Sequence, residues 1–160
     1  MLGLQESVFA LLGNGKGFVR DLETHRAIAL RAPLEGGFEG RYIRRARAKG
    51  YTAFSISARG LGDPDAYLTG VHGVRPPTLG KKDIRRFFVP PIVQTQLATL
   101  PAQSKGLVLW ILEGYVLSRQ ELGFLCDLAQ REPRLKLVVE MGGDRITSWQ
   151  PLRDLVFAAS

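Results

Sequence analysis

The chain has 160 residues and a mass of 17.7 kDa, and its 45% hydrophobic and 23% charged side chains suffice to bury the core of one domain. Lysine and arginine outnumber aspartate and glutamate by 22 to 15, so the formal charge is +7, and we expect an anionic partner: nucleic acid, an anionic membrane surface or an acidic protein. Cys126 is the only cysteine, which excludes an internal disulfide and any cluster or zinc site ligated by several cysteines of this chain.

The first 32 residues predict a short arm followed by a hairpin. The apolar run Val8–Leu12 is typical of a short docking helix, and Gly13–Gly17 predicts a turn. We expect Phe18–Asp21 and Ala27–Leu30 to pair as strands, with His25 in the loop between them. The glycine-rich turn does not match a phosphate-binding loop, because its spacing differs and because it leads into a predicted strand rather than a helix.

A basic helix is predicted from about Gly40 to Lys49. Tyr42, Ile43 and Ala46 fall on one side at helical spacing. The other side is cationic and carries Arg41, Arg44, Arg45, Arg47 and Lys49. Gly50 is placed to end this helix, and the alternation of Tyr51–Ala58 then predicts a strand.

The middle of the chain is rich in turns. Asp63-Pro64 predicts a second helix that ends near Gly73, where His72 would interact with the helix dipole. A short strand, Arg86–Val89, and a short helix, Ile92–Leu100, are expected to follow.

The C-terminal half carries the clearest local signals. Leu107–Leu112 is a continuous apolar run, as expected for a central strand covered on both faces. Ser118 and Glu121 form a capping box, which predicts a helix from there to about Arg131. The remaining expected elements are a strand at Leu135–Glu140, a strand at Arg145–Trp149, and a last helix from Pro151 to Ala158 or Ala159.

This alternation of strands and helices predicts an α/β (or α+β) fold. We expect an N-terminal arm of residues 1–12 and a single domain of residues 13–160, with a central mixed sheet flanked by helices. The longest apolar run has six residues, well short of the roughly 20 that a membrane-spanning helix needs. The N-terminus lacks the basic start of a secretory signal, so we expect a soluble chain in its working compartment.

Glu113 is the most interesting carboxylate, since ligand sites in α/β sheets favour the ends of buried strands. A small-molecule enzyme with a site beside Glu113 and Asp144 is therefore one alternative. We expect instead that Glu113 is structural and that turn amides or an arginine such as Arg145 satisfy it.

No other side chains form a recognisable catalytic or metal-binding pattern. His25 and His72 lack companions at metal-ligand spacing. We expect Cys126 to be semi-buried, opposite Leu122, Leu125 and Ala129 or at the edge of their helix face. The sequence thus predicts no catalytic, cofactor-binding or metal-binding residue.

The basic helix and a second cluster, Lys81-Lys82 with Arg85-Arg86, exceed what solubility requires. A nucleic-acid-binding module is a further alternative, but no aromatic stacking residues are interleaved with these cations. A docking surface for acidic proteins fits the same charges.

Several strings together resemble one family. The match starts at Gly15–Leu22 and continues through Pro33–Tyr42, Ala58–Asp63, Tyr67–Pro77, Leu79–Lys82, Val89–Val93, Ser104–Trp110 and Val138–Arg145. In this order and spacing they are similar to subunit N of the NAD(P)H–quinone oxidoreductase of cyanobacteria and chloroplasts. This chain differs from the family in a shorter stretch around residues 83–88 and in its first dozen residues.

The resemblance implies a peripheral, non-catalytic subunit of a thylakoid complex. That complex passes electrons to plastoquinone with coupled proton translocation, in cyclic electron flow and respiration, and its iron–sulfur clusters lie in neighbouring subunits. The expected partners are other subunits of the hydrophilic arm on the cytoplasmic or stromal side, with no cofactor, nucleic acid or small-molecule substrate bound by this chain. The expected interface comprises Arg41, Arg44, Arg45, Arg75, Lys81 and Lys82.

Overall fold

The computed structural model describes residues 15–33, 38–60, 68, 72–74, 87–89 and 92–157 of the chain. The helices are α2 (Gly15–His25), α3 (Phe38–Ala48), α4 (Ile92–Ala98), α5 (Arg119–Arg131) and α6 (Leu152–Val156), with the 3-10 turns η1 (Ala58–Gly60) and η3 (Gly114–Val116). The strands are β1 (Ala27–Ala32), β2 (Tyr51–Ser57), β3 (His72–Val74), β4 (Phe87–Val89), β5 (Gly106–Leu112), β6 (Leu135–Gly143) and β7 (Ser148–Pro151).

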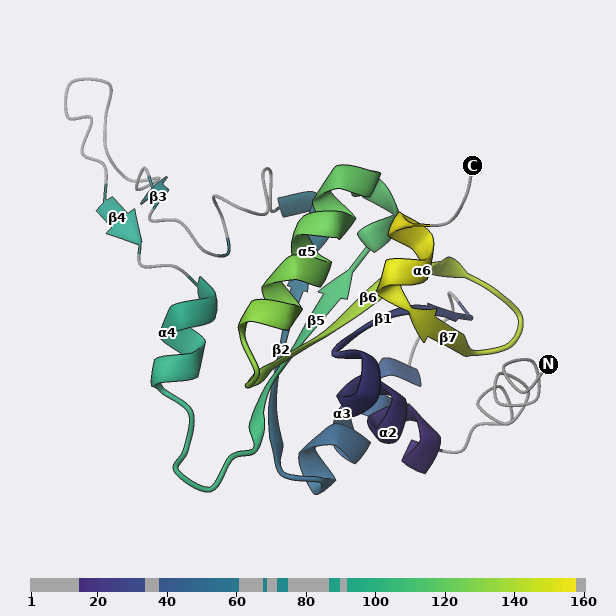
Figure 1. The fold of residues 1–160 in the computed structure, drawn as a ribbon, viewed down its shortest axis with the longest axis horizontal. Helices are drawn as coiled ribbons and strands as arrows, with labels where there is room; N and C mark the ends of the chain where they lie inside the picture. Colours follow the sequence, from purple (N-terminus) through teal and green to yellow (C-terminus); the bar gives the residue numbers. More distant parts are fainter. Residues whose placement is uncertain are drawn as a thin grey trace.

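Five strands form one twisted sheet in the order β2-β5-β6-β1-β7 (Figure 1). The first four are parallel, and β7 runs antiparallel to β1 at the edge. Strands β3 and β4 pair as a separate two-stranded sheet. The prediction of an α/β domain with a central mixed sheet flanked by helices is confirmed.

Helices cover both faces of the five-stranded sheet (Figure 1). Helices α2 and α3 pack on one face, and α4, α5 and α6 pack on the other. Strand β1 is buried on both sides: the small residues Ala27 and Ala29 face the α5 layer, whereas Ile28 and Leu30 face the α2 layer. This double burial explains why β1 lacks the polar alternation of a half-exposed strand.

The two layers have different cores. Under α2 and α3 the core is aromatic: the Phe18 ring lies 4.8 Å from that of Tyr42 and 5.4 Å from that of Trp149, with Trp110 at 6.0 Å. Under α5 the core is aliphatic and includes Leu125. Large rings let two short helices fill one face with few side chains.

The predicted N-terminal hairpin is wrong, because residues 15–25 form α2. Phe18, Val19 and Leu22 are all buried on one side of this helix, a 3.6-residue spacing that a strand would split between two faces. Arg26, with φ at 68°, ends the helix and starts β1. The glycine-rich stretch therefore leads into a helix, although its spacing still does not match a phosphate-binding loop.

Helix α5 begins as the sequence predicts. The Ser118 hydroxyl accepts from the Glu121 amide at 3.1 Å, and the Glu121 carboxylate accepts from the Ser118 amide at 2.8 Å. This reciprocal capping satisfies two helix amides that would otherwise lack partners. No helix of the described part of the chain is long and apolar enough to cross a bilayer.

Most other predicted elements are confirmed with shifted ends. The predicted elements at 40–49, 51–58, 86–89, 92–100, 107–112, 119–131 and 135–140 correspond to α3, β2, β4, α4, β5, α5 and β6. Strand β7 starts three residues later than predicted and α6 is shorter. The N-terminal arm and most of the helix predicted from Asp63-Pro64 lie outside the described residues. His72 and Gly73 lie in β3, so the helix end predicted there is wrong.

Candidate functional site

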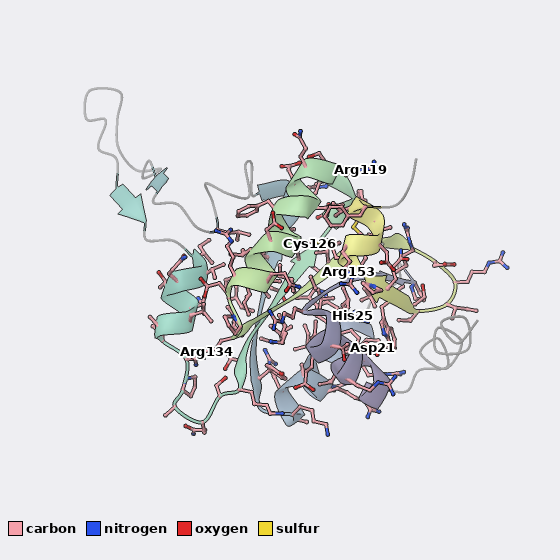
Figure 2. The ribbon with its side chains drawn as sticks, in the orientation of Figure 1. Asp21, His25, Arg119, Cys126, Arg134 and Arg153 are labelled. Atoms are coloured by element: carbon pink, nitrogen blue, oxygen red, sulfur yellow. The ribbon has the colours of Figure 1, made fainter. Side chains whose placement is uncertain are left out.

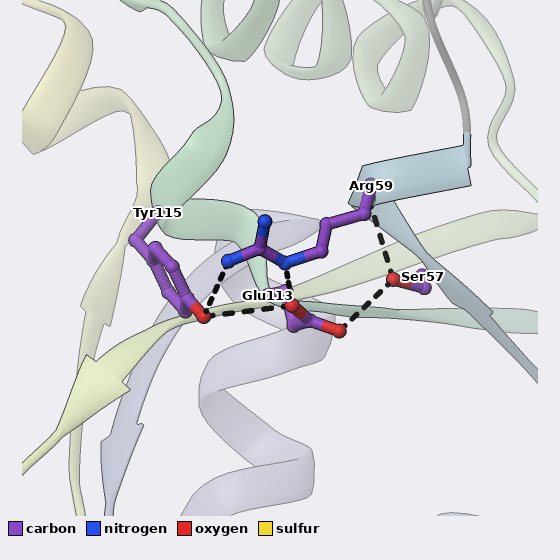
Figure 3. Close-up of polar contacts among 4 residues, drawn as sticks. All are labelled: Ser57, Arg59, Glu113 and Tyr115. Carbon is purple, nitrogen blue, oxygen red and sulfur yellow. Dashed lines mark hydrogen bonds and ion pairs between the residues drawn. The ribbon is translucent and has the colours of Figure 1, made fainter.

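The most connected polar cluster lies where the parallel strands end, at the carboxyl edge of the sheet (Figure 3). Glu113 follows the buried strand β5 with φ at 57° and ψ at 37°, a left-handed conformation that is uncommon for residues other than glycine. At Gly114 an added Cβ would overlap the Val139 side chain and lie 2.8 Å from the Glu140 carbonyl oxygen. The chain therefore turns sharply here, with glycine at the point of closest approach.

The turn presents Glu113 to residues that follow β2. Its Oε1 accepts from the Ser57 hydroxyl at 3.3 Å, and its Oε2 pairs with the Arg59 Nε. The Arg59 Nη2 donates to the Tyr115 hydroxyl at 3.3 Å. Figure 3 shows the four side chains closing into one network.

The structural role predicted for Glu113 is therefore supported, but its arginine is Arg59 rather than Arg145. Arg145 is exposed, and its backbone amide donates to the neighbouring Asp144 carboxylate at 2.7 Å. Sequence reasoning missed Arg59 and Tyr115 as partners of Glu113. The one available signal was that Arg59 lies in a string shared with the resembled family.

This network holds its charges in fixed pairs. The hydrogen bonds with Tyr115 and Glu113, in that order, raise the pKa of the Arg59 guanidinium above its ordinary value. Arg59 therefore stays cationic, and the Glu113 carboxylate accepts hydrogen bonds from three side chains, those of Ser57, Arg59 and Tyr115. The network links the side chains that follow β2 to those that follow β5.

The remaining candidates for chemistry are spread over the fold. His25 ends α2 rather than lying in a hairpin loop. Within the described ranges, no three His, Cys, Asp or Glu side chains gather as metal ligands would. Glu113 and Asp144, the two residues of the alternative enzyme site, lie beyond the ends of the neighbouring strands β5 and β6, and the Asp144 carboxylate accepts from the Arg145 amide of its own loop.

Cys126 is buried in the core, with 8% of its surface exposed, and packs with Leu122 and Leu125. The alternative that it lies opposite these residues is wrong, because Cys126 belongs to the same buried stripe of α5. The other alternative, a place at the edge of that face, agrees with the helical spacing. Burial, and then the Asp127 carboxylate, raise the pKa of the thiol to about 11, against the opposing charge of Arg153. Figure 2 labels Cys126 on α5 and Arg153 on α6.

The outer face of α3 is basic, as predicted. Tyr42 and Ala46 are buried against the aromatic core. Five cations are exposed, namely Arg41, Arg44, Arg45, Arg47 and Lys49. Among the described residues, no ion pair involves any of them. Arg75, Lys81 and Lys82, the other expected interface residues, lie outside the described residues.

A second polar cluster, absent from the sequence reasoning, lies at the opposite, amino edge of the sheet. The Tyr51 hydroxyl donates to the Glu23 Oε2 at 2.6 Å, and the Lys105 Nζ lies 3.7 Å from the same oxygen. Burial, followed by the bond to Glu23, raises the pKa of Tyr51. Burial and then Arg26 lower the pKa of the nearby Lys136, whose Nζ donates to the Pro133 carbonyl at 2.8 Å.

Comparisons with known proteins place this architecture in a family. Residues 9–154 match the family model described as NADH-quinone oxidoreductase cyanobacterial subunit N. The match begins at residue 9, so part of the N-terminal stretch that we set apart from the family is included in it.

Individual relatives agree over nearly the whole chain. The chain is 60% identical to NAD(P)H-quinone oxidoreductase subunit N of Rippkaea orientalis over 157 residues, covering 94% of this chain and 99% of the relative. The same subunit of Crocosphaera subtropica is also 60% identical, with 94% and 99% covered. That of Synechocystis sp. is 60% identical, with 93% and 97% covered. The chain therefore belongs to the family of subunit N of the NAD(P)H-quinone oxidoreductase.

Proposed function

We propose that the chain is a structural and assembly subunit of the peripheral arm of its complex and performs no catalysis by itself. It binds no cofactor in this proposal, and the iron–sulfur clusters lie in neighbouring subunits. The complex as a whole passes electrons to plastoquinone with coupled proton translocation at the thylakoid membrane, on the cytoplasmic or stromal side, in cyclic electron flow and respiration.

The exposed cations of α3 carry this proposal. Five basic side chains within nine residues have no carboxylate within 4.0 Å among the described residues. Unpaired charges of one sign steer association with an oppositely charged surface. Since family members are subunits of one complex, an acidic face of another subunit of that complex is the partner that fits.

The carboxyl-edge network supports the non-catalytic role. Glu113 is the carboxylate best placed for chemistry, and it is already paired with Arg59 and Ser57. A side chain held this way contributes to a surface of fixed shape, which suits a subunit that is recognised by its neighbours.

A pull-down of the tagged full-length chain from detergent-solubilised thylakoid membranes tests the proposal. We expect other subunits of the hydrophilic arm to be recovered with it. Recovery of the chain alone, in mild detergent and low salt, contradicts the proposed function.

The contribution of α3 is tested by reversing two charges, Arg44→Glu and Arg45→Glu, in the same pull-down. We expect a lower yield of partner subunits, whereas Arg20→Glu, a reversal on α2, serves as the control. Unchanged recovery with the α3 variant shows that this helix is not an interface.

A further inference from the structure

The four parallel strands begin at the same edge of the sheet, and the segments that lead into them meet there. Lys49 lies between α3 and β2, Lys105 directly precedes β5, and Arg134 precedes β6. The Lys105 amide donates to the Gly50 carbonyl at 2.8 Å, and the Leu107 amide donates to the Arg134 carbonyl at 2.7 Å. These bonds hold three segments that are distant in the sequence side by side.

The amino edge gathers positive charge from these segments. Its exposed cations, here called the basic edge, are Arg47, Lys49, Lys105, Arg131 and Arg134. Figure 2 labels Arg134 at the turn between α5 and β6. Two further cations, Arg26 and Lys136, are less exposed at the same edge, and the two carboxylates of its segments are Glu23 and Glu132.

The charges of the basic edge are largely uncompensated within the chain. Among the described residues, only Lys105 has a carboxylate within 4.0 Å, and its Nζ lies 3.7 Å from Glu23. At the same edge, burial and then the charge of Arg26 lower the pKa of Lys136, against the opposing effect of Glu23. Like charges held this close favour a partner that brings negative charge.

We propose that the basic edge docks on an acidic protein surface of a neighbouring subunit. This inference rests on the proposed function. It adds a second interface to the outer face of α3, and that interface is formed by the segments that lead into β2, β5 and β6. The predominance of arginine suits carboxylates, which the guanidinium binds through two parallel hydrogen bonds.

The distribution of apolar side chains favours a protein over a membrane or single-stranded nucleic acid. The large exposed hydrophobic residues of the described ranges are Tyr115, Val116, Ile146 and Phe157, and they lie after β5, after β6 and after α6. None of them is beside the basic edge, which therefore offers no aromatic platform for bases and no apolar group for lipid insertion.

The test compares two double charge reversals in the full-length tagged chain. Lys49→Glu with Arg134→Glu alters the basic edge, and Arg119→Glu with Arg145→Glu makes the same change of net charge at the carboxyl edge. All four side chains are exposed and have no ion pair among the described residues. Each chain is expressed in cells that lack the untagged subunit and is captured with its partners over a salt series.

At about 0.15 M salt, we expect the basic-edge variant to recover about one third, or less, of the partner protein that the control recovers. The difference should disappear near 1 M salt, where charges farther apart than about 3 Å are screened. Equal retention of partners by the two variants at every salt concentration overturns the inference.

Two added measurements keep the result unambiguous. Equal melting temperatures of the isolated variants show that a lower recovery of partner protein is not caused by misfolding. The double variant Lys49→Gln with Arg134→Gln repeats the test by removing the two charges instead of reversing them. If nuclease treatment releases the partners, the basic edge binds nucleic acid and not a protein. If the basic-edge variant loses binding to anionic vesicles but still recovers its partners, the basic edge binds lipid and not a protein. If the unaltered chain recovers no subunit, the proposed function fails and not only this inference.

Discussion

The two edges of the parallel sheet use their charges differently. Among the described residues of the carboxyl edge, Arg31, Arg59, Arg119 and Arg145 are matched in number by Glu113, Glu121, Glu140 and Asp144. The described segments of the amino edge carry seven cations and two carboxylates. Ligand sites of α/β sheets usually lie at the carboxyl edge, but here the described residues of that edge carry equal numbers of positive and negative charges. Of the two edges, the amino edge therefore carries the excess of positive charge that can attract an anionic partner, in addition to the outer face of α3.

The edges also differ in how they are built. The carboxyl edge depends on one tight turn, in which Glu113 takes a left-handed conformation and Gly114 packs against β6. The amino edge depends on backbone bonds between connections, such as that from Lys105 to Gly50. This contrast supports the proposal that the amino edge docks on a partner subunit.

The largest expected effect on stability comes from a substitution in the tight turn of the carboxyl edge. Gly114→Ala places a methyl group into the space of Val139 and beside the Glu140 carbonyl, so we expect a loss of at least about 1–3 kcal/mol in the free energy of unfolding, as for overpacked cores. Denaturant unfolding measures it. Gly123→Ala is the matched control, because its Cβ would meet only Val156, at 3.5 Å; an equal loss in both variants contradicts the interpretation.

Cys126 lies in the core between the two edges, and its raised pKa makes the free energy of unfolding depend on pH. Its pKa in the folded chain is raised to about 11 from an ordinary value of 9.0, so its contribution to stability is complete below pH 9.0 and is lost as the pH rises through about 11. We expect stability between these pH values to fall more steeply for the natural chain than for Cys126→Ala, by roughly 1–2 kcal/mol. Parallel pH curves would contradict this.

Tyr51 at the amino edge and Tyr115 at the carboxyl edge allow the removal of one hydroxyl group to be compared between the two edges. Tyr51→Phe removes the 2.6 Å bond to Glu23 from a buried ring, and we expect a loss of about 1 kcal/mol in the free energy of unfolding. Tyr115→Phe removes a hydroxyl from a half-exposed ring, where water replaces the lost partner, so a loss below about 0.5 kcal/mol is expected. Thermal unfolding of both variants at neutral pH decides, and the reverse order contradicts the comparison.

The smallest expected effect is a gain in the stability of the isolated chain. If the cations of the basic edge repel one another, Lys49→Gln with Arg134→Gln stabilises the isolated chain by a few tenths of a kcal/mol at low salt, in proportion to weak surface electrostatics. Neutralising Arg119 and Arg145 gives no such gain, because the described residues of the carboxyl edge carry as many carboxylates as cations. Melting temperatures at low and high salt measure the difference, and a loss of stability in the basic-edge variant would contradict mutual repulsion.

The sequence by itself determined the elements that depend on neighbouring residues. The Ser118–Glu121 box begins α5, the apolar run at Leu107–Leu112 forms a buried strand, and the basic face of α3 is exposed. Capping and helical periodicity act within a few residues, so they can be read from the chain directly. The strings spread over residues 15–145 likewise indicated the family before any fold was known.

Tertiary structure decided the rest. Residues 18–22 form a helix because Phe18 and Leu22 are buried under the aromatic core, although the same letters also suited a strand. Arg59 pairs with Glu113 because β2 and β5 are neighbours in the sheet, and nothing in the local sequence states that order. Lys49, Lys105 and Arg134 form one basic edge for the same reason: parallel strands bring together segments that the sequence separates by dozens of residues.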